Sequence, residues 1–131
     1  MELYRMDNGE VHMTESEGKG TIGMILARTA SSSERPVAAL ALAQDLLAAG
    51  KQVGVFLVGD GIYLAKDGGT EAARIIKDLI SKGAKVYVSP EHLKASGLSK
   101  ERLVAGVAIV EDTYRDLVEF VMEWHEKVIV C

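Results

Sequence analysis

The chain has 131 residues, of which 48% are apolar, and a formal net charge of −4 at pH 7. This length suits one globular domain with its own core, and the acidic balance argues against nucleic acid or an anionic membrane as a partner. No apolar run approaches the roughly 20 residues of a membrane span, and the polar first 20 residues lack a signal-peptide pattern, so we expect a cytoplasmic protein without a membrane span.

Residues 1–20 are predicted to form an extension that is separate from a domain over residues 21–131. Asn8 and Gly9 stand between two short stretches of alternating character. Asn-Gly is typical of a tight hairpin turn, because both residues tolerate positive φ. We therefore expect an N-terminal β-hairpin, followed by a polar, glycine-containing linker that ends at Gly20.

From Thr21 onward, short apolar segments bounded by turn residues alternate with helical patterns. We expect strands at 21–27, 51–58, 86–88, 107–110 and 127–130. Helices are expected at 36–49, from Thr70 to the glycine at 83, after Pro90, and from Thr113, with Asp116 completing a capping box at this last start. This alternation predicts a three-layer α/β/α fold with a mainly parallel five-stranded sheet.

All strands of a parallel sheet with right-handed crossovers end at the same edge. Helix N-termini at that edge direct backbone amides and partial positive charge at a common crevice. Any site is therefore expected to use the loops that leave the strands. These segments are 28–33, 59–63, 89–92, 111–113 and Cys131.

Two stretches of the chain resemble a known family. They are FLVGDGIYLA from Phe56 and VYVSPEHLKASGL from Val86, supported by the strand that follows Gly106 and by the closing VIVC. Together they resemble the DsrE/DsrF/TusD family of small sulfur-relay proteins over residues 21–131. The resemblance implies a single α/β domain with a parallel five-stranded sheet that assembles into homo-oligomers, trimers or hexamers, with other sulfur-relay proteins as partners.

The resemblance also assigns a role to the exit of the third predicted strand of this domain. In the family this exit carries the cysteine that accepts sulfur, followed eight positions later by a glycine. Gly97 matches the glycine, but Ser89 stands where the cysteine would be. The exit of the second strand, residues 60–63, matches the family pattern of a polar residue, glycine, a β-branched residue and an aromatic.

Serine at position 89 changes the chemistry that is available there. A cysteine at a helix N-terminus has a lowered pKa, so its thiolate can accept sulfur as a persulfide. Serine cannot form a persulfide and is a weak nucleophile without a base, which excludes sulfur transfer through this residue. We interpret Ser89 first as the N-cap of the helix that begins at Pro90, a role that requires no further function. His92 offers a further alternative, a Ser-His hydrolase, for which no third orienting acid is identified.

Cys131 is the chain's one cysteine, which excludes an internal disulfide and a multi-cysteine metal site. It follows a strand at the expected functional edge, which favours a displaced relay thiol. The alternative is a residue at a frayed end, where a nearby carboxylate disfavours the thiolate by like charge. We retain both interpretations.

A second class of function is a small-molecule or anion-binding domain with no covalent chemistry. Serines beside an arginine, before a helix, can bind an anion, and an acid with a phenol can line a small pocket. The same residue types also act as ordinary capping and turn residues. No dinucleotide fingerprint is present, and no cofactor or metal is expected. The binding candidates are Arg28, Ser31, Ser32, Ser33, Asp60, Gly61, Tyr63 and His92.

Apolar residues also recur at helical spacing between Tyr114 and Trp124. We interpret this stripe as part of the core or of an oligomer interface. The apolar loop 62–64 and Leu98 are further candidates for subunit contact, because exposed apolar clusters mark association.

Overall fold

The computed structural model describes residues 5–7, 10–12, 20–27 and 35–131. The strands within these residues form two separate sheets. In the smaller sheet, β1 (Arg5–Asp7) pairs antiparallel with β2 (Glu10–His12). This pairing agrees with the predicted hairpin, whose connection, Asn8 and Gly9, lies outside the described residues.

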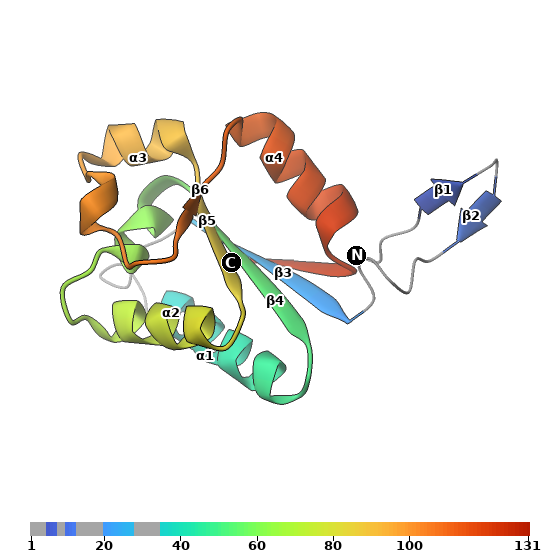
Figure 1. The fold of residues 1–131 in the computed structure, drawn as a ribbon, viewed down its shortest axis with the longest axis horizontal. Coiled ribbons are helices and arrows are strands. Elements are labelled where there is room, and N and C mark those ends of the chain that lie inside the picture. The colour runs from blue at the N-terminus through green and yellow to red at the C-terminus, as the bar shows by residue number, and fades with distance from the viewer. Residues whose placement is uncertain (1–4, 8–9, 13–19, 28–34) are drawn as a thin grey trace.

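The larger sheet has five strands in the order β6-β5-β4-β3-β7, and each strand is parallel to its neighbours. This confirms the predicted parallel five-stranded sheet and brings all five strand exits to one edge (Figure 1). The strands are β3 (Thr21–Leu26), β4 (Gln52–Leu57), β5 (Lys85–Val88), β6 (Ala108–Ile109) and β7 (Lys127–Val130).

Helices cover both faces of this sheet, as the α/β/α prediction requires. Two long helices lie together on one face, and α4 lies on the other (Figure 1). The helices are α1 (Arg35–Ala48), α2 (Glu71–Ser81), α3 (Pro90–Ser96) and α4 (Thr113–Glu119). Shorter turns are η1 (Gly59–Ala65) and η2 (Lys100–Arg102), which are 3₁₀-helical, and η3 (Phe120–Trp124), a π-turn. Among the described helices, none is long and apolar enough to cross a membrane.

The main core lies between the sheet and the α1–α2 layer. Alternate residues of β4 face these helices, and Val55 and Leu57 are fully buried there. They pack in one cluster with Met24 of β3, Leu40 of α1 and Ile76 of α2. Burial of each such side chain contributes about 1.5–3 kcal/mol.

The opposite face of the sheet carries an aromatic cluster beneath α4 and η3. The ring centroid of Phe120 lies 5.4 Å from that of Phe56 and 6.1 Å from that of Tyr87. Trp124 and His125 complete the cluster, with the centroids of Phe120 and His125 4.2 Å apart. Edge-to-face and tilted pairs of this kind stabilise beyond their buried area.

Two glycines form the floor beneath this cluster. Gly23 of β3 and Gly54 of β4 are register partners on adjacent strands. A Cβ at Gly54 would come within 2.4 Å of Nε2 of His125, and one at Gly23 within 2.9 Å of the same ring and of Phe120. Glycine in a strand interior marks this kind of close approach.

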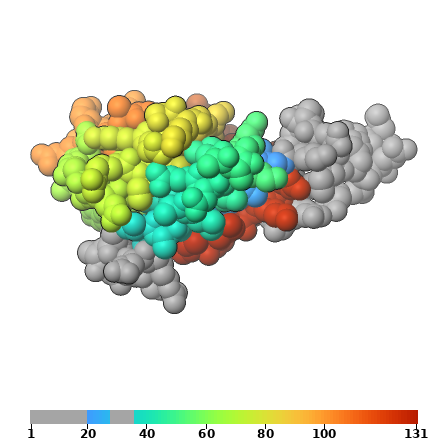
Figure 2. Space-filling view, turned by 90° about the horizontal axis from the view of Figure 1, so that it is seen from below, coloured from blue at the N-terminus to red at the C-terminus, as the bar shows by residue number. Residues whose placement is uncertain are grey.

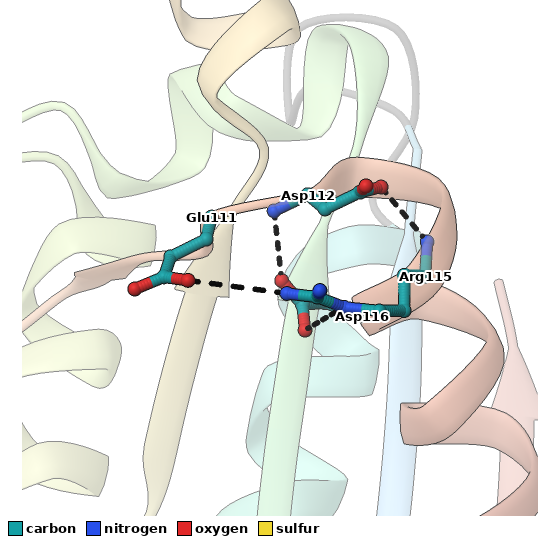
Figure 3. Close-up of polar contacts among 4 residues, drawn as sticks. All are labelled: Glu111, Asp112, Arg115 and Asp116. Atoms are coloured by element: carbon teal, nitrogen blue, oxygen red, sulfur yellow. Dashed lines mark hydrogen bonds and ion pairs between the residues drawn. The ribbon is translucent and has the colours of Figure 1, made fainter.

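The start of α4 differs from the predicted capping box. Asp112, not Thr113, is the N-cap, and its side chain accepts a hydrogen bond from the amide of Arg115 at 3.0 Å. Asp116 accepts from the amide of Asp112 at 2.9 Å (Figure 3). Thr113 cannot serve as the cap because its hydroxyl is bonded to groups that follow β5.

The exit of β4 departs from its prediction, and the C-terminal apolar stripe has a buried part and an exposed part. Residues 59–63, expected as a loop, belong to η1. In the stripe, Tyr114 and Val118 are exposed, and Phe120 is the residue buried against the sheet. A helical period identifies an apolar side without showing which side faces the sheet.

Candidate functional site

The site is built around Ser89, which links the end of β5 to the start of α3. Its extended backbone and its side-chain oxygen, 3.2 Å from the amide of His92, make it the N-cap of α3, with Pro90 in the first turn. The helix ends at Gly97, whose φ of 78° is a conformation that favours glycine. Ser89 is fully buried (0% exposed), so its hydroxyl lies inside the domain.

The hydroxyl of Ser89 joins the exits of two neighbouring strands. It lies 2.7 Å from the hydroxyl of Thr113, which follows β6. The Glu91 carboxylate accepts from Thr113 and lies 3.4 Å from the Ser89 oxygen. The three side chains form a hydroxyl–hydroxyl–carboxylate chain that fixes the starts of α3 and α4 relative to each other.

The imidazole of His92 is hydrogen-bonded to the exit of β4. Its Nδ1 accepts a hydrogen bond from the amide of Gly59 at 3.0 Å, at the exit of β4. In the neutral ring the proton therefore resides on Nε2, because the other nitrogen is the acceptor. The imidazole of His92 is bonded to Gly59, whereas the hydroxyl of Ser89 contacts Thr113 and Glu91. These contacts do not pair the two side chains as a Ser-His dyad.

Gly61 explains why η1 lies so close to β3. A Cβ at this position would come within 2.1 Å of the carbonyl oxygen of Leu26. Only glycine allows two backbones to approach this closely. Asp60, beside it, is exposed.

Tyr63 ties η1 to α3. Its hydroxyl donates to the carbonyl of Ser96 at 2.7 Å, and its ring is partly exposed. The predicted pair of Asp60 and Tyr63 therefore lies on one short helix, with the phenol already bonded to protein. This contact gives Tyr63 a structural role that requires no ligand.

Cys131 is exposed at the end of β7. Its amide donates to the carbonyl of Ile25 at 2.8 Å, and its carbonyl accepts from the amide of Ala27 at 3.4 Å. The sheet order separates β7 from β5 by three strand spacings, or about 14 Å at the usual spacing between strands. Cys131 therefore shares an edge with Ser89 but does not occupy its place.

The remaining binding candidates, Arg28, Ser31, Ser32 and Ser33, lie outside the described residues. Within the described part of the chain, no group of three or more His, Cys, Asp or Glu side chains could hold a metal ion. A shallow depression of about 270 Å³ lies between α1 and α2, the two helices on the face seen in Figure 2. It is lined by Gln44, Glu71, Arg74 and Ile75.

Sequence reasoning did not identify Thr113 and Glu91 as partners of Ser89. Glu91 stands two residues after the cap, which is a local signal for a carboxylate near a helix start. Thr113 gives no such signal, because its approach depends on β5 and β6 being neighbours. His125 was also missed as a buried group, although Gly23 and Gly54 inside predicted strands indicated a close approach.

Comparison with known proteins places this geometry in a family. The DsrE/DsrF-like family matches residues 21–130. The uncharacterized protein MK0008 of Methanopyrus kandleri is 32% identical over 116 residues, covering 85% of this chain and 94% of that protein. The uncharacterized protein MJ0989 of Methanocaldococcus jannaschii is 32% identical over 105 residues, covering 76% and 90%.

Two solved structures share the fold. The ychN protein of E. coli superposes with a TM-score of 0.65 at 16% identity, covering 88% of this chain and 99% of its own. Protein MTH1491 of Methanobacterium thermoautotrophicum gives a TM-score of 0.61 at 20% identity, covering 85% and 97%. With the family match over 21–130 and the five-stranded parallel sheet, these findings show that the chain belongs to the DsrE/DsrF-like family.

Proposed function

We propose that this protein is a cytoplasmic binding or scaffold subunit of intracellular sulfur trafficking that does not itself carry the sulfur. The family relationship supports a sulfur-relay-related role. The observation that carries the finer proposal is the state of Ser89, a buried hydroxyl at the strand exit that the resemblance assigned to the relay cysteine.

The contacts of Ser89 support a structural role for this residue. Its oxygen accepts from the amide of His92 and is paired with the hydroxyl of Thr113. A hydroxyl cannot form a persulfide, and the nearby carboxylate of Glu91 is already bonded to Thr113. The residues that a relay site would use are therefore engaged in holding α3 and α4.

A second candidate is a sulfur carrier that uses Cys131, which is favoured by its exposure at the same edge of the sheet. In this reaction the Cys131 thiolate attacks a terminal sulfur of a polysulfide. The Sγ–S bond forms as the terminal S–S bond of the polysulfide breaks, which gives a Cys131 persulfide and, as leaving group, the polysulfide shortened by one sulfur. Both partners exchange sulfur at constant total oxidation state, so no further oxidant is required.

Intact mass after incubation with polysulfide, with and without reductant, separates the two candidates. Under the scaffold proposal, the native chain gains no stoichiometric, reducible sulfur. A gain in the native chain that Cys131→Ser abolishes would reject it in favour of the carrier. The single thiol makes this assignment possible without peptide mapping.

The proposal includes assembly into a homo-oligomer, trimer or hexamer, which the resemblance implies. Sedimentation equilibrium measures this directly. A mass equal to that of one chain over the accessible concentration range would contradict the assembly without affecting the sulfur experiment.

A further inference from the structure

The outer side of α4 and η3 presents three large apolar side chains to solvent. Tyr114 is 80% exposed, Val118 59% and Met122 51%. They are spaced four residues apart, which places them along one side of a helix. Phe120, on the inner side, is fully buried against the sheet, so the stripe is not needed for the core.

Exposed carboxylates accompany this stripe. The segment 111–126 contains six carboxylate side chains and one arginine. Of the six, Asp116 is buried, and Glu126 accepts a hydrogen bond from the amide of Gly20. Arg115 lies 3.9 Å from carboxylate oxygens of both Glu111 and Asp116 (Figure 3), so its charge is already matched within the segment. Asp112 and Glu123 remain exposed at the two ends of the stripe. The surface has an apolar centre and an acidic rim, the arrangement of a recognition surface.

The negative charge of the rim favours some binding partners of this surface over others. Nucleic acids and anionic membranes are repelled by it. A second copy paired about a twofold axis places the Asp112 end of one stripe beside the Glu123 end of the other, so like charges meet. A segment with an apolar side flanked by lysine or arginine matches both the centre and the rim.

We propose that this surface, formed by Tyr114, Val118 and Met122 with the exposed carboxylates Glu111, Asp112 and Glu123, docks a basic amphipathic segment of another protein. The inference rests on the proposed binding role of the chain. Its test uses no sulfur chemistry, so its failure and that of the proposed function are distinguishable. The contact is expected to weaken as salt is raised, because the rim charges are exposed.

The test measures the affinity of a fluorescent helical peptide with leucine on one side and lysine on the other. A scrambled peptide of the same composition is the control for non-specific attraction. We expect Val118→Ser and Tyr114→Ser each to weaken binding by about tenfold, a typical effect for a central contact. Glu123→Lys, which reverses a charge of the exposed rim, should weaken it by about two- to fivefold. Matched controls are Leu42→Ser, an exposed apolar residue of α1, and Glu101→Lys, an exposed acid of η2. These should change affinity by less than about twofold.

Equal affinity of the native chain and the three α4–η3 variants would overturn the proposal, as would equal binding of the scrambled peptide. A native oligomer of any size that Val118→Ser breaks into smaller species would also overturn it, because another copy of the chain then covers the surface. The substituted side chains are exposed, so the variants should unfold at the native urea midpoint, and this is checked first.

Discussion

The imidazole of His125 lies directly over Gly54, in a space that no other amino acid would leave open. A Cβ at Gly54 would be 2.4 Å from Nε2 and 2.9 Å from Cε1 of that ring. The ring is held in this position by a 3.0 Å hydrogen bond between its Nδ1 and the carbonyl of Phe120. The contact joins η3 to the middle of the sheet.

Replacing Gly54 with alanine is expected to destabilise the domain by about 1–3 kcal/mol, the usual cost of overpacking. The matched control is Gly68→Ala, where an added Cβ would meet nothing within 4 Å. Alanine there should be neutral or slightly stabilising, because it restricts the unfolded chain. Urea denaturation measures both free energies of unfolding. A Gly54→Ala variant as stable as Gly68→Ala would contradict the contact.

The stability of the domain should fall as pH drops below about 6.5, the ordinary pKa of histidine. Burial lowers the pKa of His125, although its hydrogen bond to Phe120 opposes this shift. The unfolded chain therefore binds the proton first, and this contribution to stability is complete above pH 6.5 and is lost as pH falls toward the lower folded pKa.

Urea midpoints for the native chain and His125→Gln, measured between neutral and mildly acidic pH, test this expectation. The variant should lose the part of the pH dependence that belongs to His125, while its carboxylates still titrate at lower pH. Parallel curves for the two chains would show that His125 is not the group responsible.

Loss of the Ser89 hydroxyl should destabilise the domain by about 0.5–2 kcal/mol, the range for an N-cap. Ser99→Ala is the matched control, because Ser99 is an N-cap whose side chain makes no capping bond. A double-mutant cycle of Ser89→Ala with Thr113→Val isolates the contact between the two hydroxyls. Additive effects in this cycle would mean that the 2.7 Å contact contributes nothing to stability.

Gly61→Ala should be among the most damaging single substitutions at the sheet edge. Its Cβ would meet the carbonyl oxygen of Leu26 at 2.1 Å, so the backbone of η1 or β3 must move. We expect a loss of about 3 kcal/mol or more, since backbone atoms cannot yield as a flexible side chain can. Asp60→Ala, at the exposed neighbouring residue, should have an effect within about 0.5 kcal/mol. Thermal melting of the two variants makes this comparison.

Local signals in the sequence were sufficient for most of the fold. Thr70 is the N-cap of α2, accepting from the amide of Ala73 at 3.1 Å, and Gly83 follows that helix with a φ of 96°. Ser89 is the N-cap of α3, as the Ser-Pro pair predicted. These features are decided within a few residues of chain, so a single sequence contains them.

Features that depend on contacts between distant elements were not predicted. From the sequence, Thr113 is as suitable an N-cap for α4 as Asp112 is. In the structure Asp112 is the cap, because the Thr113 hydroxyl is bonded to Ser89, which follows the neighbouring strand β5. Likewise, the apolar stripe of α4 gave no indication that Phe120 rather than Tyr114 faces the sheet. In the candidate site, the sequence supplied Ser89 and its helix start, whereas its partners required the strand order.

The pairing of β7 with β3 also sets the order in which the domain can be completed during synthesis. β3 (Thr21–Leu26) emerges from the ribosome about 100 residues before its neighbour β7 (Lys127–Val130), so one of its two edges stays open through most of translation. Long-range parallel pairing of this kind is intrinsically slow to form. The nascent chain can assemble β3, β4 and β5 with their helices first, and the exit of β7 from the ribosomal tunnel then closes the sheet.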